Sequence, residues 1–429
     1  MKNDTSRRWP PRALGVITAS KGGAGVASSL SLPPGSLCRM GSPSGVLGES
    51  ISFRDGSTLI MSLAPDYQWL PGTLIYAEPP LDPPQADLLL GRVVDGLGRP
   101  IDGGPLPQRQ ARRARPPAAN PMERRRLSLQ LDVGVRAING LLPIAQGQRV
   151  GIFAGSGVGK SSLLSMMAKH TRTERVVLAL IGERSREVRE FIEDNLGADG
   201  LSRSVVIAVS AGESALMKIR AANLACDIAD DFKQDGKSCL LIMDSLTRYA
   251  MACREVGLAC GETPASKGYP PSVFSRVNAL VERAGPGSET RGEGDITAFY
   301  TVLSEGDDLQ DPVADGARAI LDGHIVLSRQ IADAGIYPPI DIPASVSRAA
   351  GLLAGPEQAA LMRQYRQLIS AYAENEDLIK AGAYQNGQDP LLDQAIIKIA
   401  GLRAYGMQEK DQACPIVESL ARLRAILSS

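Results

Sequence analysis

Two glycine-rich stretches of the chain have residue types that could hold phosphate. Residues 151–164 read GIFAGSGVGKSSLL, and residues 17–31 read ITASKGGAGVASSLS. A phosphate-binding P-loop follows a strand and precedes a helix, and its backbone N–H groups surround the phosphates. Its lysine reaches the β- and γ-phosphate oxygens, and its Ser or Thr hydroxyl ligates Mg²⁺. The presence of that lysine and that hydroxyl therefore decides between the two stretches.

The stretch at residues 151–164 meets all of these requirements. A β-rich run precedes it, a helical run follows it, and only Ala154 departs from the consensus, at the glycine position that closes the strand. We therefore favour a P-loop over an accidental glycine-rich turn, and predict an ATP site in which Ser161 also ligates Mg²⁺. The predicted nucleotide-binding residues are Gly155, Ser156, Gly157, Val158, Gly159, Lys160, Ser161 and Ser162.

The stretch at residues 17–31 lacks the groups that hold a triphosphate. Val26 and Ala27 stand at the positions of the phosphate-binding lysine and the Mg²⁺-ligating hydroxyl. Flexible glycines without a cation or a hydroxyl do not bind a triphosphate, so we predict that this stretch is a hairpin turn between two strands.

Hydrolysis of ATP also needs carboxylates beside the P-loop. The apolar run CLLIMDS ends in Asp244, and the apolar run VVLALIGERSRE reaches Glu183 at its end. There we expect Asp244 to orient Mg²⁺ and Glu183 to polarise the attacking water. Glu187, one helical turn further, is a candidate for the Mg²⁺ shell. For all three the alternative is a carboxylate that only caps or decorates a helix.

Composition excludes several classes of function. The 429 residues carry 47 Lys+Arg and 47 Asp+Glu, and a net charge of zero argues against a nucleic-acid binder. The basic runs at 112–115 and 123–126 lack interleaved aromatics, which favours a solvated linker or a subunit contact. Six scattered cysteines and two histidines form no zinc motif. The chain shows no apolar run near the ~20 residues that span a bilayer and no secretory signal, so we expect a cytoplasmic protein with reduced thiols.

The hydrophobic pattern divides the chain into successive regions. Short apolar runs broken by Gly, Pro and Asp-Gly come first and predict a small β-barrel. Strands then alternate with helices, which predicts an α/β domain with a mainly parallel sheet, and helix dominates the end of the chain. The predicted regions are a short N-terminal segment (1–13), the barrel (14–90), a linker (91–147), the α/β domain (148–350) and a helical domain (351–429).

Seven motifs, in order, resemble those of the flagellar and type III secretion export ATPases, which are relatives of the catalytic β subunit of F-type ATP synthase. They are GIFAGSGVGKSSLL, GERSREVREF, LLIMDSLTRYA, GYPPSVFSRV, GDITAFYTVLSEGDD, LDGHIVLSR and YPPIDIPASVSR. The linker motif LLGRVVDGLGRPIDGGPL belongs to the same pattern. The resemblance extends from about residue 14 to about residue 392.

The resemblance implies a barrel, a RecA-like ATPase domain and a helical C-terminal domain, assembled as a homohexamer with ATP between protomers. It implies catalytic roles for Lys160, Glu183 and Arg184. It also gives Asp244 the Walker B role and places the cations Arg184 and Arg248 near it. Arg348 matches the arginine finger that enters the neighbouring protomer's site, and an arginine in trans supplies the cation that the P-loop lacks. The alternative for Arg348 is an intrachain salt bridge.

Two further positions follow from the same resemblance. Tyr337, in IYPPID, matches the residue whose ring stacks on adenine, with a packed core tyrosine as the alternative. Asn139 stands where relatives usually carry Asp, which predicts a weaker local charge contact and no effect on catalysis. The tail after Ile399 departs from the usual ending, because Cys414-Pro415 interrupts it before a last amphipathic helix.

The implied function is that of an ATP-driven motor for flagellar-type protein export. Such a motor releases chaperones from exported proteins, helps to unfold them, and works with stator or regulator and export-gate proteins at the inner face of the membrane. One alternative is the ATPase of a virulence-type injectisome. A Rho-type RNA helicase shares the hexameric core but needs a basic, aromatic barrel face. A non-catalytic subunit of a rotary complex would lack the carboxylate of Glu183.

Overall fold

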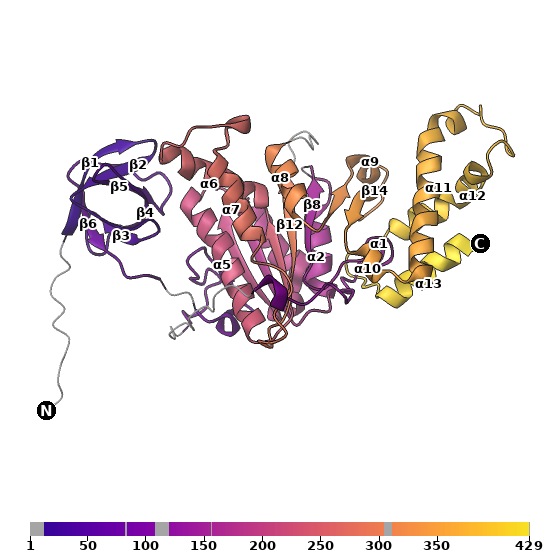
Figure 1. The fold of residues 1–429 in the computed structure, drawn as a ribbon, viewed down its shortest axis with the longest axis horizontal. Coiled ribbons are helices and arrows are strands. Elements are labelled where there is room, and N and C mark those ends of the chain that lie inside the picture. The colour runs from indigo at the N-terminus through magenta and orange to yellow at the C-terminus, as the bar shows by residue number, and fades with distance from the viewer. Residues whose placement is uncertain (1–12, 82–83, 108–119, 156, 304–310, 429) are drawn as a thin grey trace.

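The computed structural model describes residues 13–81, 84–107, 120–155, 157–303 and 311–428. They form a closed β-barrel, a central sheet flanked by helices, and a group of C-terminal helices, arranged in a row (Figure 1). The predicted fold class is therefore confirmed. Ser156, the basic run at 112–115 and nearly all of the predicted segment 1–13 lie outside the described residues.

Six short strands close the barrel in the order β1-β2-β5-β4-β3-β6. Gly22 and Gly23 both have positive φ, 57° and 81°, in the turn that joins β1 to β2, so the predicted hairpin is confirmed. Asp55 and Gly56 make the corresponding turn between β4 and β5. The strands are β1 (Ala13–Lys21), β2 (Ala24–Ser28), β3 (Leu37–Met40), β4 (Val46–Arg54), β5 (Ser57–Ser62) and β6 (Leu74–Ala77).

The glycines of residues 17–31 serve packing inside the barrel domain. A Cβ on Gly25 would lie 2.3 Å from the Trp69 ring, so only glycine leaves room for that ring. The Trp69 indole Nε1 donates a hydrogen bond to the Gly23 carbonyl (2.9 Å), which holds the turn against the ring. Trp69 therefore explains Gly25, whereas Gly22 and Gly23 are explained by the positive φ of the turn.

The central sheet has eight strands in the order β14-β13-β8-β12-β11-β9-β10-β7, parallel except where β14 pairs antiparallel with β13. The strands are β7 (Val93–Val94), β8 (Arg149–Ala154), β9 (Arg175–Glu183), β10 (Ser204–Ser210), β11 (Cys239–Asp244), β12 (Ile296–Leu303), β13 (Gly323–Leu327) and β14 (Ile340–Ser347). The helices of this layer are α2 (Lys160–His170), α3 (Ser185–Glu190), α4 (Gly197–Ser202), α5 (Ala215–Gln234), α6 (Leu246–Ala259), α7 (Pro271–Val281), α8 (Pro312–Ile320) and α9 (Arg329–Asp333).

Side chains of the central strands are buried on both faces of the sheet. In β9, Val177 and Ala179 pack in the core shared with α5–α8 and the barrel, whereas Val176 and Leu178 pack in the core shared with α2 and the C-terminal helices. Complete burial of a Val or Leu contributes about 1.5–3 kcal/mol. The uninterrupted apolar runs of the sequence therefore reflect strands covered on both sides.

The segment predicted as a linker, 91–147, is partly built into the central layer. β7 pairs in parallel with β10 and forms an edge of the sheet. α1 (Arg136–Leu141) is buried along its whole length and contacts α13. A two-residue strand is too short to show a periodicity, which is why the sequence indicates only a connection here.

The C-terminal layer consists of α10 (Ala350–Leu353), α11 (Pro356–Lys380), α12 (Pro390–Gly406) and α13 (Ile416–Ser428). Tyr365 and Tyr405 are buried between these helices, and their hydroxyls donate to the carbonyls of Leu402 (3.2 Å) and Ser419 (3.1 Å). The predicted last helix after Cys414-Pro415 is α13. Among the described helices, none combines the length and apolar character that a membrane crossing needs.

Candidate nucleotide-binding site

The predicted P-loop connects β8 to α2 in the centre of the sheet. Gly157 (φ 75°) and Gly159 (φ 97°) have positive φ, which lets the backbone turn tightly before the helix. No side chain caps the N-terminus of α2, so the N–H groups of its first turn are directed toward the loop. An uncapped helix N-terminus behind left-handed glycines is the geometry that binds phosphate.

Lys160 joins the two predicted carboxylates. Its Nζ lies 2.5 Å from Asp244 Oδ1 and 3.1 Å from Glu183 Oε1, and all three side chains are largely buried. Burial opposes the charge of Lys160, but the attraction of Asp244 and Glu183 outweighs this effect and raises the lysine pKa. The ammonium therefore stays charged. Three residues far apart in the sequence thus converge at the carboxyl ends of β8, β9 and β11.

Thr301 is a member of this cluster that sequence reasoning missed. Its hydroxyl donates to Asp244 Oδ1 (2.7 Å) from the neighbouring strand β12, and its side chain is fully buried. The hydroxyl fixes the orientation of the carboxylate that Lys160 also holds. A polar residue inside the apolar run ITAFYTVL was the available signal, but its partner depends on the order of the strands.

Arg184 and Glu187 lie outside this cluster. Arg184 is highly exposed and pairs with Glu187 at 3.3 Å on the surface of α3. Glu187 is about half exposed, so the structure gives its predicted role in the Mg²⁺ shell no supporting contact. Ser161 is exposed and Ser162 half-buried in the first turn of α2, and Val158 is buried beneath the loop.

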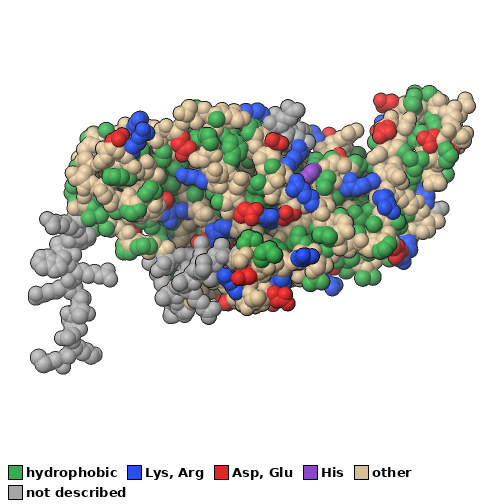
Figure 2. Space-filling view, in the orientation of Figure 1, with side chains coloured by type: hydrophobic (Ala, Val, Ile, Leu, Met, Phe, Trp, Pro, Cys, Tyr) green, Lys and Arg blue, Asp and Glu red, His purple; other side chains and the backbone are tan. Residues whose placement is uncertain are grey.

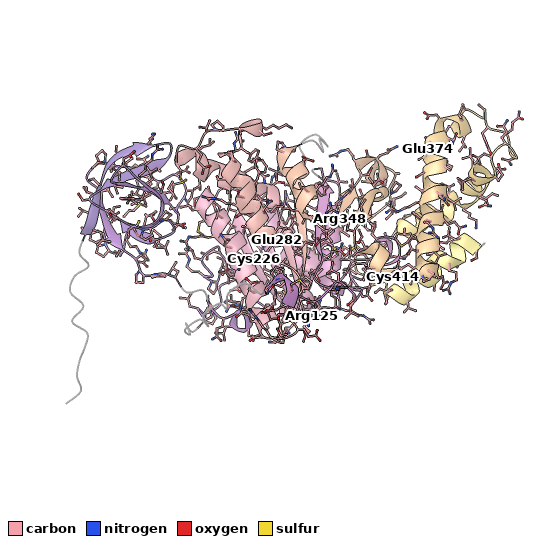
Figure 3. All side chains as sticks on the ribbon, in the orientation of Figure 1. Arg125, Cys226, Glu282, Arg348, Glu374 and Cys414 are labelled. Carbon is pink, nitrogen blue, oxygen red and sulfur yellow. The ribbon has the colours of Figure 1, made fainter. Side chains whose placement is uncertain are left out.

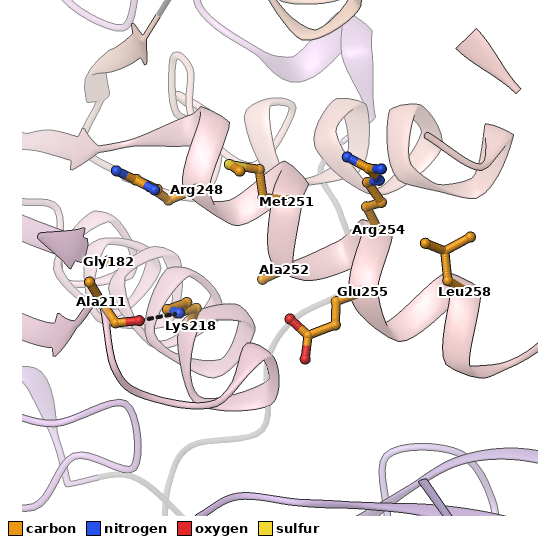
Figure 4. Close-up of a pocket in the computed structure, with 9 residues that line it drawn as sticks. All are labelled: Gly182, Ala211, Lys218, Arg248, Met251, Ala252, Arg254, Glu255 and Leu258. Carbon is orange, nitrogen blue, oxygen red and sulfur yellow. Dashed lines mark hydrogen bonds between the residues drawn. The ribbon is translucent and has the colours of Figure 1, made fainter. Parts of the chain in front are cut away.

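Arg248 lies beside the strand that carries Glu183. Its side chain packs against Gly182, where a Cβ would come within 3.2 Å of Arg248 Cγ. Both residues line a pocket of about 360 Å³, together with Lys218 and Glu255 (Figure 4). The Lys218 ammonium donates to the Ala211 carbonyl at 2.8 Å. Because Gly182 directly precedes Glu183, the arginine lies beside the strand end that carries this carboxylate, where it adds positive charge at the edge of the site.

Tyr337 lies against the P-loop. A Cβ on Gly159 would come within 3.3 Å of Tyr337 Cε1, so the ring packs directly over this glycine. The side chain is 48% exposed, which excludes the alternative of a packed core tyrosine. The Tyr337 carbonyl accepts a hydrogen bond from the Gln408 backbone N–H (2.8 Å), so the C-terminal layer supports this loop.

Arg348 and the P-loop of the same chain lie at opposite ends of the sheet strands. Arg348 follows Ser347, which pairs with Gly323 at the beginning of β13. The P-loop, in contrast, follows the end of β8, which runs parallel to β13. Arg348 is exposed, and Figure 3 shows it on the central layer toward the C-terminal helices. This placement favours contact with another protomer over contact with the Lys160 cluster of the same chain.

The residues present fit a magnesium-bound nucleotide. The loop offers backbone N–H groups and a charged lysine to phosphate, and Ser161 and Asp244 offer the oxygen donors that Mg²⁺ prefers. Figure 2 shows acidic and basic side chains interspersed over one face of the molecule, without the single-sign surface of a nucleic-acid binder.

Two family models match the chain. The nucleotide-binding domain of the ATP synthase alpha/beta family matches residues 134–347. The C-terminal domain of the type III secretion ATPase EscN matches residues 354–425. The two matches together cover the central layer and the C-terminal helices.

Similar proteins match nearly the whole chain. The "Flagellum-specific ATP synthase" of Salmonella typhimurium is 50% identical over 415 residues, covering 92% of this chain and 90% of the relative. That of Pseudomonas aeruginosa is 47% identical, covering 94% and 90%. The solved structure of the assembled ATPase EscN from the enteropathogenic E. coli type III secretion system is 37% identical, with a TM-score of 0.88, and covers 96% of this chain and 100% of that one. A structure of assembled EscN with its central stalk EscO gives a TM-score of 0.84 at 37% identity, with coverages of 96% and 100%.

Proposed function

Because this chain belongs to the flagellum-specific ATP synthase family of ATPases, we propose that it is the ATP-hydrolysing motor of a flagellar-type protein export apparatus. The contact of Lys160 with both Glu183 and Asp244 carries this proposal, since it brings the phosphate-binding cation and the two carboxylates into one site. A non-catalytic subunit would not need the strand-end carboxylate of Glu183.

Each residue of the cluster has a separate task. The N–H groups at the start of α2 and the ammonium of Lys160 bind the β- and γ-phosphates. Glu183 holds and polarises the attacking water, and Asp244, which Thr301 orients, would help to hold Mg²⁺. The Ser161 hydroxyl would ligate Mg²⁺ when it binds with ATP, and the ion would neutralise charge on the phosphate oxygens. Tyr337 packs on adenine beside Gly159.

We infer that the site is completed by a neighbouring copy in a homohexameric ring. Arg348 is exposed and lies at the end of the strands opposite its own P-loop, so its guanidinium can reach the site of the next protomer. Charge on the γ-phosphate grows as the transition state forms, and an arginine in trans stabilises it there. Solved structures of assembled EscN support the ring.

The export role implies partners at the membrane. We propose that the ring binds export chaperone–substrate complexes, export-gate proteins and a stator or regulator, on the cytoplasmic side of the apparatus. The structure of EscN with its stalk EscO supports a stalk-type partner. The match of residues 354–425 to the EscN domain keeps injectisome use as a second candidate. The family matches give no support to the Rho-type RNA helicase alternative.

Substitution of Glu183 tests the catalytic assignment. We expect Glu183→Gln to bind ATP and assemble but to lose turnover by about 100-fold or more, because the water loses its polarising carboxylate. Glu190→Gln is a matched control, since Glu190 pairs with Arg186 on the exposed surface of α3. Fluorescent-nucleotide binding and phosphate release measure the two properties. Wild-type turnover in Glu183→Gln would contradict the assignment.

Mixed rings test the arginine finger. Lys160→Ala and Arg348→Ala are each expected to be inactive alone. In a mixture, an intact P-loop of one variant meets an intact Arg348 of the other at some interfaces, so part of the activity should return. Absence of any recovery in rings shown to contain both variants would exclude action in trans. Export use is tested by restoration of motility in a strain that lacks the flagellar ATPase.

A further inference from the structure

A cluster of three side chains connects the P-loop strand to the region of Arg348. The Arg318 guanidinium lies over the Phe153 ring, with 4.8 Å from its Cζ to the ring centroid. The His324 ring meets the same phenyl ring edge-on, at 5.7 Å between centroids. Arg318 is in the last turn of α8, and His324 is in β13. One aromatic ring therefore holds together three elements of the central layer.

Phe153 ties this cluster to the nucleotide site. It is the second-last residue of β8, directly before Ala154 and the P-loop. Its ring lies over Gly151 on the same strand. A Cβ on Gly151 would lie only 2.6 Å from Phe153 Cε2, so the glycine leaves room for the ring. Gly151 pairs with His324 in β13, which brings the ring to the histidine. The buried Phe153 ring thus lies between the strand end that enters the P-loop and His324.

Arg348 is attached to the other side of the same cluster. Its Nη2 donates to the Arg318 carbonyl (3.2 Å), one of the last carbonyls of α8, where a cation is favoured by the helix dipole. Its backbone N–H donates to the Asp322 carbonyl (3.0 Å). The residue that stacks on Phe153 therefore also accepts from the predicted arginine finger.

The charges of the cluster are not neutralised within the described part of the chain. No ion pair of Arg318 or Arg348 occurs among these residues, and the buried Arg318 Nε has no hydrogen-bond acceptor there. Burial and the neighbouring Arg318 lower the pKa of His324, so its imidazole adds no further charge. The Phe153 ring is thus the main identified support of the Arg318 side chain, and a cation–π contact of this kind contributes about 0.5–2 kcal/mol.

We propose that Arg318 is a positioning residue that links the P-loop of one protomer to the finger which that protomer offers to its neighbour. This inference rests on the proposed function, in which Arg348 acts in trans. Phosphate binding in the P-loop moves the end of β8 and the Phe153 ring, and the stacked Arg318 carries that movement to α8 and the carbonyl that holds Arg348. Nucleotide binding at one protomer's P-loop thereby positions that protomer's Arg348, which enters the neighbouring site. The sites of the ring are coupled in this way.

Removal of the stack tests the link. We expect Arg318→Gln, which retains the backbone carbonyl, to assemble and bind fluorescent nucleotide normally. Its kcat should fall ~3–10-fold, and its Hill coefficient for ATP should fall from above unity in the wild type toward unity. Arg318→Lys keeps a cation over the ring and should restore most of both properties. Phe153→Leu should resemble Arg318→Gln, and the double variant should be no worse than either single variant.

Arg403→Gln is the matched control. Arg403 makes the same type of contact with Tyr372 (5.1 Å) in the C-terminal layer, so its loss should leave kcat and cooperativity unchanged. Wild-type kcat and Hill coefficient in Arg318→Gln would overturn the link, as would effects of Arg318→Gln and Phe153→Leu that simply multiply. These results are distinct from failure of the proposed function, which would appear as wild-type activity of Arg348→Ala itself.

Discussion

Asn139 anchors the C-terminal tail, and its replacement by Asp provides a sharp test of buried polar contacts. Its Nδ2 donates to Asp132 Oδ1 (2.7 Å) and to the Cys414 carbonyl (2.9 Å), and its Oδ1 accepts from the Val133 N–H (3.1 Å). The side chain is fully buried. The amide is therefore a strong donor to a carboxylate, which corrects the expectation of a merely weakened charge contact.

Asn139→Asp removes both donors and places two carboxylates side by side in a buried space. An uncompensated buried charge costs about 3–5 kcal/mol, so we expect a loss of that size in the free energy of unfolding of the C-terminal layer. The penalty applies to the ionised carboxylate. It should therefore shrink as the pH falls toward the unfolded-state pKa of Asp, about 3.9, where the new group is protonated in both states.

Denaturant unfolding and thiol labelling measure this effect. The Cys414 thiol is 1% exposed (its position is labelled in Figure 3), and it should react with iodoacetamide much faster once the anchor is lost. Asn375→Asp is the control, because within the described part of the chain the Asn375 amide donates only to the Ala371 carbonyl of α11. If Asn139→Asp changed the free energy of unfolding by less than about 1 kcal/mol and left Cys414 protected from labelling, the reasoning would be refuted.

Three further predictions concern the site and the thiols. Thr301→Val removes a hydrogen bond to a charged group, which is worth about 1.5–3 kcal/mol. Turnover should therefore fall by about tenfold, while circular dichroism should show that the variant still folds. Wild-type turnover would contradict this prediction. Tyr337→Ala should weaken nucleotide binding about tenfold, whereas Tyr337→Phe should not, and titration with fluorescent ATP measures both affinities. An affinity of Tyr337→Ala equal to that of the wild type would exclude stacking. Burial raises the pKa of Cys253 to about 11, so at pH 8 the more accessible Cys260 should be alkylated first, and mass spectrometry showing equal rates would contradict this.

The parts of the site that lie at the ends of strands could be predicted from the sequence. Lys160 sits within a motif of fixed spacing, and Glu183 and Asp244 each close an apolar run. In a parallel sheet the carboxyl ends of strands meet at one edge, so each of these residues is placed by its own local pattern. Tyr337 and Arg348 were predicted from the resemblance instead, because no local pattern marks either of them.

Contacts that depend on the order of strands could not be predicted in this way. Thr301 reaches Asp244 because β12 lies between β8 and β11, and this order appears only in the folded sheet. The same limit explains why β7 was not predicted. Its two residues pair with β10, a strand that is far away in the sequence. The barrel turns, in contrast, were predictable, because positive φ in a short hairpin selects Gly and Asp-Gly.

The polar contacts of the C-terminal tail illustrate why a sequence pattern can misjudge a single position. Gln408 donates from its Nε2 to the Gly134 carbonyl (2.8 Å) and accepts at its Oε1 from the Arg136 N–H (2.7 Å). Together with Asn139, it satisfies backbone groups at the entry to α1 that no regular element would pair. A buried amide both donates and accepts, whereas a carboxylate only accepts. Amides suit positions 139 and 408 because the backbone groups around them include both N–H donors and carbonyl acceptors.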